Sequence, residues 1–286
     1  MRLLSNVRLG CLFTLLGLVG VGAARAAPPE PGGESKPAAP PVVAPPAPVA
    51  PAAGKSDPKV LAEVDELWKK RDDPDALAKM KVLVDRGVAQ APGDYEILWR
   101  ATAWHFWVSD DPQRSRDEKI KAAKAGWDLG ERAVAANPQG VEGQFFTTVS
   151  IGNYSIGIGI LRALTQRIEG KFLTRLREAE RLDPSYAKGS IWVTWGRYHA
   201  TLPWPKYDAK KATAAFQHAI EVNPNNLRAR VYWAELLLDE GQAAQAKRLL
   251  DEVAKAPATG RYDPPEERRT KLLGTMLLPK VVEALK

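Results

Sequence analysis

Five prolines each follow the end of a helical pattern in this chain, at intervals of 46, 46, 40 and 33 residues. Proline lacks an amide hydrogen and restricts the residue before it, so it ends a helix and separates one unit from the next. Helix-ending prolines at such recurring intervals predict an array of similar helical units, each packed on its neighbours. The five are Pro92, Pro138, Pro184, Pro224 and Pro257.

Between residues 187 and 257 the pattern becomes more specific. Ala219 allows two helices to approach closely, and Phe216 fills the groove between them. The residue types and offsets resemble the tetratricopeptide repeat, a helix–turn–helix unit of about 34 residues. The resemblance implies an all-α fold, a helical-hairpin repeat array (α-solenoid), over residues 58–278. The matching positions are Trp192, Gly196, Ala212, Phe216, Ala219, Pro224, Gly241, Ala246, Leu250 and Pro257.

The longer intervals predict insertions in the earlier units, at residues 109–116, 152–167 and 202–205. After the last unit, Asp263 followed by two prolines predicts the start of a C-terminal capping helix. Pro279 is expected to end or kink that helix, which makes residues 279–286 a tail. The adjacent carboxylates of Glu266 and Glu267 are expected on the solvated surface of the helix.

The N-terminus has the pattern of a signal peptide over residues 1–26. A basic start precedes the apolar run 9–21, and Ala24-Arg25-Ala26 offers small residues for cleavage. An uncleaved membrane anchor is the alternative interpretation. Residues 27–57 are rich in proline and alanine, which predicts a disordered, extended linker. We therefore expect a periplasmic or secreted protein.

Composition excludes several functions. The 41 basic and 34 acidic residues give a net charge of +7, too small and too dispersed for nucleic-acid binding. Cys11 lies within the predicted signal peptide, and His105, His199 and His218 have no partners at metal-ligand spacing. No nucleophile motif or phosphate loop is present. The sequence thus predicts neither an enzyme nor a cofactor or metal site.

Residues 143–161 carry no charge and approach the length of a membrane span. Glutamine, asparagine and several hydroxyl residues interrupt the run, and it coincides with the first helix of the third unit. We expect a buried helix whose small residues permit close packing, or one that lines a cavity; a membrane span is the weaker alternative.

In a helical repeat array the first helix of each unit lines the concave surface. Most of the nine tryptophans are expected to fill grooves between helices. Aromatic residues with polar neighbours on first helices, and the stiff loop 202–205, are the candidate contacts for a protein partner or a ligand. The candidate binding residues are Trp99, Phe106, Asn153, Tyr154, Arg197 and Trp204.

A narrower resemblance covers residues 141–253. The segments Arg181–Tyr186, Gly196–Ala200, Leu202-Pro203 and Ala212–Ile220 resemble the TatT component family associated with TRAP-type transporters. This resemblance implies an exported helical protein that works beside a periplasmic solute-binding protein and holds a small apolar ligand. It also leaves homo-oligomerisation open. A scaffold for protein–protein interaction and a ligand-binding transport component are therefore both retained.

Overall fold

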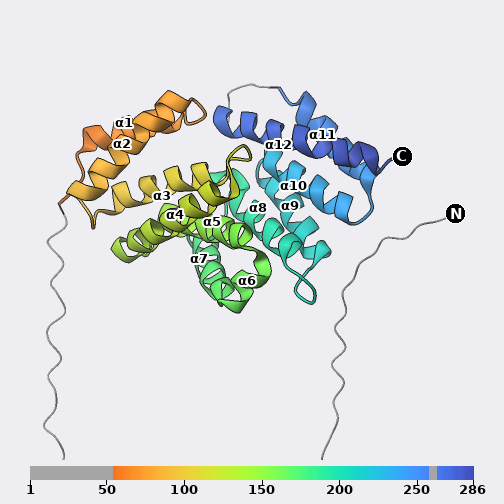
Figure 1. The fold of residues 1–286 in the computed structure, drawn as a ribbon, viewed down its shortest axis with the longest axis horizontal. Coiled ribbons are helices and arrows are strands. Elements are labelled where there is room, and N and C mark those ends of the chain that lie inside the picture. The colour runs from red at the N-terminus through yellow and green to blue at the C-terminus, as the bar shows by residue number, and fades with distance from the viewer. Residues whose placement is uncertain (1–53, 258–262) are drawn as a thin grey trace, which may run out of the picture. The chain divides into compact units, whose positions relative to one another are not determined.

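The computed structural model describes residues 54–257 and 263–286. Within these ranges all regular structure is helical, which confirms the all-α prediction (Figure 1). The predicted signal peptide and most of the predicted linker lie outside the described residues. The helices are α1 (Pro58–Trp68), α2 (Pro74–Gln90), α3 (Tyr95–Ser109), α4 (Arg116–Ala136), α5 (Val141–Ile158), α6 (Ile160–Thr165), α7 (Ile168–Leu182), α8 (Tyr186–Thr201), α9 (Ala209–Val222), α10 (Leu227–Asp239), α11 (Ala243–Lys255) and α12 (Pro264–Glu283).

Each of the five prolines follows a helix as predicted. Helices α2, α4, α7, α9 and α11 all end two residues before the proline of their unit. The intervening residue leaves the helical conformation, as at Asn137 with φ −146° and ψ 92°. This is the conformation that a following proline favours, because its ring clashes with a helical neighbour.

The helices form two layers. The first helices of successive units contact one another in the order α1, α3, α5, α8 and α10, and α12 packs on α10. The second helices α2, α4, α7, α9 and α11 each pack against the first helix of their own unit and of the next. This pairing is that of a helical-hairpin array, in which each unit buries its apolar face on its neighbours.

The insertion expected in the third unit is an extra helix. Gly159, with φ 97°, ends α5, and the short α6 follows before Arg167, with φ 57°, leads into α7. The apolar run 143–161 therefore forms α5 and the start of α6. Among the described residues, no helix is long and apolar enough to cross a bilayer.

The predicted contact between Phe216 and its small neighbours lies at the centre of the fourth unit. Phe216 and Ala219 of α9 are both fully buried. A Cβ atom added to Gly196 of α8 would lie 2.4 Å from the Phe216 ring, so α8 passes directly over that ring. The small residues thus set the distance between the two helices, as the sequence pattern predicts.

Replacing Ala219 by leucine should lower the free energy of unfolding by about 1–3 kcal/mol, because the site has no room for a larger side chain. Urea denaturation measures this loss. The matched control is Ala244→Leu on the exposed face of α11, which should change stability by less than about 0.5 kcal/mol. Equal effects of the two substitutions would contradict the packing described here.

The capping helix α12 starts as predicted, since the Asp263 side chain accepts a hydrogen bond from the Glu266 amide. Its end differs from the prediction. The helix continues through Pro279 to Glu283, so the expected boundary at residue 278 and the tail 279–286 are wrong. Val281 is fully buried in the cluster between α10, α11 and α12. Burial of this apolar face offsets the cost of about 3 kcal/mol for a proline inside a helix.

His105 of α3 is an internal histidine. Burial lowers its pKa from 6.5 to about 4, with the positive charge of Lys81 adding to the effect. The unfolded chain therefore binds a proton at a higher pH than the folded chain. Stability should fall as the pH drops from about 6.5 to about 4, by on the order of 2–3 kcal/mol.

Chemical denaturation across this pH range tests the assignment. His105→Gln should flatten the part of the pH dependence between about 4 and 6.5. An unchanged slope in the His105 variant would show that other groups cause the acid sensitivity.

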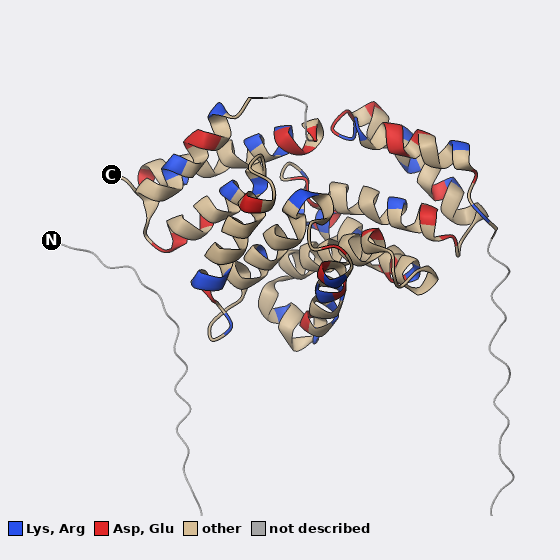
Figure 2. Ribbon diagram, turned by 180° about the vertical axis from the view of Figure 1, so that it is seen from behind, with Lys and Arg blue, Asp and Glu red and all other residues tan. Residues whose placement is uncertain are grey.

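Lysine and arginine alternate with aspartate and glutamate over the described helices (Figure 2). Many of these charges pair within one helix at a spacing of three or four residues, as Lys124 and Asp128 do. Such pairs contribute only a few tenths of a kcal/mol each. The structure therefore matches the small, dispersed net charge noted in the sequence.

Candidate functional site

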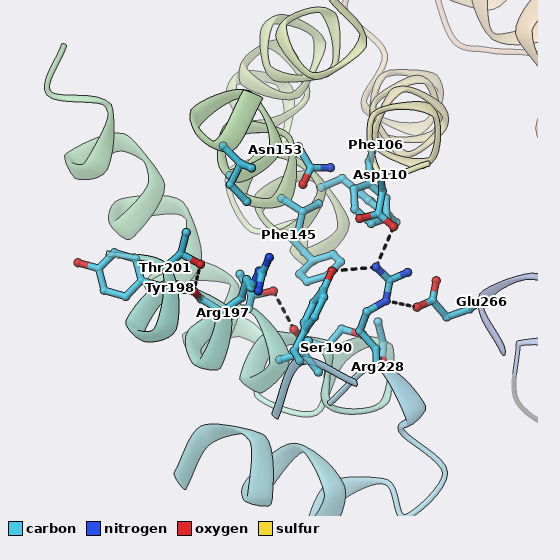
Figure 3. A pocket seen from close by; sticks show the side chains of 18 of the residues that line it. Phe106, Asp110, Phe145, Asn153, Ser190, Arg197, Tyr198, Thr201, Arg228 and Glu266 are labelled. Carbon is cyan, nitrogen blue, oxygen red and sulfur yellow. Dashed lines mark hydrogen bonds and ion pairs between the residues drawn. The ribbon is translucent and has the colours of Figure 1, made fainter. Parts of the chain in front are cut away.

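A cavity of about 390 Å³ lies on the inner side of the array. Its lining residues come from α3, α5, α8 and α10, with further residues from α6, α7 and the start of α12. In the close-up of Figure 3, side chains from these separate helices converge on one space. A volume of this size falls in the range of small-molecule sites, and it also suits a few side chains of a partner protein.

Aromatic rings form much of the cavity wall. Phe145 and Phe146 of α5 are 5% and 8% exposed and belong to the uncharged run seen in the sequence. Phe146 contacts Phe106 at 5.9 Å between ring centroids, and Phe145 contacts Tyr186 at 5.3 Å. The rings therefore support one another and offer a preformed apolar surface. The other aromatic lining residues are Trp68, Phe172, Tyr198 and Tyr232.

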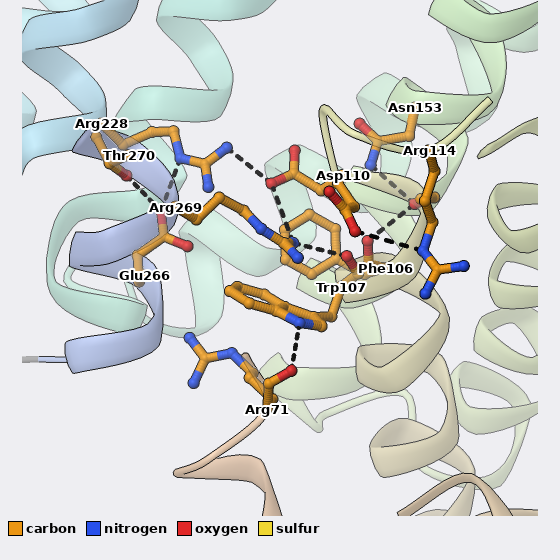
Figure 4. Close-up of polar contacts among 12 residues, drawn as sticks. Arg71, Phe106, Trp107, Asp110, Arg114, Asn153, Arg228, Glu266, Arg269 and Thr270 are labelled. Atoms are coloured by element: carbon orange, nitrogen blue, oxygen red, sulfur yellow. Dashed lines mark hydrogen bonds and ion pairs between the residues drawn. The ribbon is translucent and has the colours of Figure 1, made fainter. Parts of the chain in front are cut away.

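Arg228 of α10 is the centre of a charged cluster in this wall (Figure 4). Its Nε donates to Glu266 Oε1 at 2.7 Å, and its Nη1 donates to Asp110 Oδ2 at 2.8 Å. Nη1 also donates to the Tyr232 hydroxyl at 3.1 Å. The Arg228 side chain is 10% exposed, so these pairs are largely removed from water.

The opposite charges in this cluster shift one another's pKa values. Burial by itself would lower the pKa of Arg228, but the charges of Asp110 and Glu266 raise it well above its usual value. Burial would likewise raise the pKa of Glu266, and the charge and hydrogen bond of Arg228 keep it low. Arg228 and Glu266 are therefore both charged at neutral pH.

Trp107 of α3 lies against two arginines that are far apart in the sequence, Arg71 before α2 and Arg269 in α12 (Figure 4). The guanidinium carbons of Arg269 and Arg71 lie 3.2 and 4.4 Å from its ring centroid. The indole Nε1 donates to the Arg71 carbonyl at 2.8 Å, and Arg269 Nη1 donates to the Trp107 carbonyl at 2.6 Å. Burial lowers the pKa of Arg269 to about 10, which still leaves it charged at neutral pH.

These side chains also join the first unit to the capping helix. Arg71 Nη2 donates to Asp263 Oδ2 at 2.6 Å, and Arg268 pairs with Asp72. Helix α12 packs closely on α10 and α11, whereas its contact with the first units is made by these long polar side chains. One side of the cavity is thus lined by the Arg71–Asp263 ion pair, whose partners lie far apart in the sequence.

A family model described as "Tetratricopeptide repeat" matches residues 206–263. The crystal structure of TTC0263, a thermophilic TPR protein of Thermus thermophilus, aligns with a TM-score of 0.55 and 19% sequence identity, over 77% of this chain and 98% of that chain. The helical domain has the tetratricopeptide repeat fold.

A structure of PilF from Pseudomonas aeruginosa aligns at 15% identity over 79% of this chain and 93% of that chain, with a TM-score of 0.44. That agreement is too low to support further argument. No curated protein sequence gives a significant match. The comparisons therefore establish the fold of the helical domain.

Three of the six residues predicted to bind a partner or ligand line the cavity of the repeat domain: Phe106, Asn153 and Arg197. Asn153 Nδ2 donates to Ser109 Oγ at 2.9 Å, and Arg197 Nη1 donates to Glu235 Oε2 at 2.7 Å. They come from three successive first helices, α3, α5 and α8, which is the arrangement expected of a tetratricopeptide repeat array.

The other three predicted residues lie away from the cavity lining. Trp99 stacks on Phe146 at 6.2 Å, behind the wall, and Tyr154 packs on Trp127 at 5.6 Å. Trp204 is 87% exposed in the loop between α8 and α9. Trp99 and Tyr154 fill grooves between helices because their positions turn away from the inner face.

Sequence reasoning missed several residues of the cavity wall. Arg228 and Tyr232 are one helical turn apart on a first helix, so the reasoning that selected Arg197 also applies to them. Asp110 lies in the insertion expected at 109–116. Tyr186 carries no such signal, because it is the first residue of α8 and is separated from the regular part of that helix by a turn through residues 187–189 with positive φ.

The expectation that Glu266 and Glu267 are solvated is wrong. Glu267 is only 8% exposed, and the Glu266 side chain is 24% exposed and hydrogen-bonded to Arg228. Both line the cavity. The first turn of α12 is turned inward because the helix packs on α10, a long-range arrangement with no local signal in the sequence.

Proposed function

We propose that this chain is a scaffold protein of the cell envelope that binds a protein partner on the inner face of its tetratricopeptide repeats. The observation that carries the proposal is the cavity, with its aromatic walls contributed by the first helices. Stacked helical repeats offer continuous concave surfaces, on which such arrays bind other proteins. Buried aromatic and arginine side chains are also the residue types that contribute most to binding energy.

The envelope location is supported by the signal-peptide pattern of residues 1–26. We expect the mature chain to begin at Ala27, followed by the proline-rich linker. N-terminal sequencing of the protein purified from the producing cells tests this. A chain that retains residues 1–26 would contradict export with cleavage.

Partner binding is tested by blocking the cavity. The partner is first captured from a periplasmic extract with the full-length chain, identified by mass spectrometry and produced separately. Thr194 of α8 lines the cavity and is partly exposed, so Thr194→Trp should fill the space and weaken binding by about tenfold or more. The control is Lys210→Trp on the exposed face of α9, which should bind normally.

Whether the partner also contacts the exposed loop between α8 and α9 is tested separately with Trp204→Ala. Reduced affinity in this variant would show that the partner extends beyond the cavity onto the loop. Circular dichroism and thermal unfolding must show that each variant is folded. Normal binding by a folded Thr194→Trp variant would place the working surface elsewhere and defeat the proposal.

A TatT-like auxiliary component of a transport system is the second candidate. The volume of about 390 Å³ favours this reading, because it lies in the range of small-molecule sites. Native mass spectrometry of the purified chain tests it. A co-purified small molecule that is lost in Thr194→Trp, together with binding to a solute-binding protein, would favour this candidate over the scaffold.

A further inference from the structure

The carboxylates of the cavity wall fall into two groups. Most are paired with a basic side chain of the same domain: Asp110 and Glu266 with Arg228, Asp263 with Arg71, and Glu169 with Lys206. In each of these pairs the negative charge of the carboxylate is neutralised by the adjacent basic side chain. They hold the helices together and need no ligand to complete them.

Glu267 is different. It lines the cavity and is more than nine-tenths buried, yet it makes no side-chain hydrogen bond or ion pair with any residue that the structure describes. The neighbouring Arg268 adds a long-range charge effect, but its guanidinium is hydrogen-bonded to Asp72. Glu267 is therefore a buried carboxylate that faces a cavity without a counter-ion from the described chain.

Its position in the first turn of α12 places it near the positive end of the helix dipole, which attracts a carboxylate only weakly and supplies no ion pair. A cation bound in the cavity would supply the missing partner.

The surrounding wall is suited to a cation. Aromatic faces attract positive charge, and Phe145 and Tyr186 belong to the same lining; the Trp68 ring already has the Arg71 guanidinium carbon 4.2 Å from its centroid. Two guanidinium nitrogens in the wall, Arg71 Nε and Arg228 Nη2, also lack hydrogen-bond partners. The charges of those two arginines are already balanced by Asp263, Asp110 and Glu266, so they provide a weaker argument for an anion.

We propose that the cavity receives an organic cation, an ammonium group carried on an apolar body, with Glu267 as its counter-charge and the aromatic wall around it. This inference rests on the proposed function, because it names the chemistry of the group that the cavity holds. A free amine and a lysine side chain of a protein partner share that chemistry.

Three probes with one aromatic body and different charges test the inference: 2-phenylethylamine, 2-phenylethanol and 3-phenylpropionate. Their dissociation constants are measured by NMR titration of the full-length chain at neutral pH. The amine should bind about tenfold more tightly than the alcohol, and the acid most weakly. This comparison needs no variant, so it holds even if a substitution at Glu267 impairs folding.

The Glu267→Gln variant then assigns the charge effect. It should remove the preference for the amine and leave the affinity for the alcohol within about twofold. Glu283→Gln, at the exposed end of the same helix, is the matched control and should behave as the unmodified chain. A preference that survives Glu267→Gln, tightest binding of the acid, or binding of none of the probes would each overturn the proposal.

Equal binding of the amine and the alcohol would also overturn it, while leaving the cavity as an apolar binding site and the proposed function intact. The two sources of the cation are distinguished by blocked tripeptides, one with a central lysine between phenylalanines and one with norleucine in its place. Tighter, Glu267-dependent binding of the lysine peptide than of the free amine indicates a partner side chain. The reverse order indicates a small amine.

Discussion

Replacing Arg228 by alanine is expected to lower the free energy of unfolding by about 3–5 kcal/mol. The substitution leaves the carboxylates of Asp110 and Glu266 close together without their shared cation. Both are largely shielded from water, with side-chain exposures of 11% and 24%, so solvent cannot replace the lost charge. Guanidinium-induced unfolding, followed by circular dichroism, measures the loss.

Two further variants show whether the effect comes from the unpaired charges. Arg230→Ala, on the same helix, removes a pair with the exposed Glu252 and should cost less than about 1 kcal/mol. Combining Arg228→Met with Glu266→Gln should recover much of the stability, because Asp110 keeps the buried Arg269 as an ion-pair partner at 3.8 Å and Glu266 no longer carries a charge. If the double variant is as unstable as Arg228→Ala, the loss is one of packing and the electrostatic explanation is wrong.

Replacing Phe216 by alanine should cost about 3–5 kcal/mol, the range for a fully buried phenylalanine. Its ring fills the groove between α8 and α9 and belongs to a buried cluster that also includes residues of α10. Loss of the ring therefore leaves a void at the junction of two repeats. The control is Val222→Ala on the same helix, at a residue 37% exposed, which should cost less than about 1 kcal/mol.

A double-mutant cycle with Gly196 tests the contact itself. Gly196→Ala alone should cost about 1–3 kcal/mol, because the new methyl group meets the Phe216 ring. In the Phe216→Ala background the same methyl group points into the void, so its cost should largely disappear. Additive costs in the cycle would show that the two residues do not constrain each other.

Local features of the fold could be predicted because their causes lie within a few residues of chain. Each proline restricts its own backbone and that of its neighbour, so the ends of five helices follow from sequence alone. The same holds for Asp73 and Asp263, whose side chains cap the helices that follow them. The filling of the groove between α8 and α9 by Phe216 also follows, because the repeat pattern assigns Phe216 to one helix of a hairpin.

The cavity wall was partly predictable for a related reason. First helices line the inner face of the array, which places Phe106, Asn153 and Arg197 in the cavity wall. Which side of a first helix faces inward depends on how the units stack, and helix periodicity alone does not fix that angle. Periodicity therefore does not reveal that Trp99 and Tyr154 turn away from the cavity.

The charged part of the cavity was decided by tertiary structure. Arg228 and Asp110 meet across 118 residues of sequence, and Arg71 and Asp263 across 192. The energies of such pairs depend on burial and on distances set by the packing of whole units, which leave no local pattern. The continuation of α12 through Pro279 has the same origin, since burial of Val281 against α10 and α11 outweighs the local preference of proline. Residue stereochemistry thus determined the helices and their order, while packing between distant units determined which charges face the cavity.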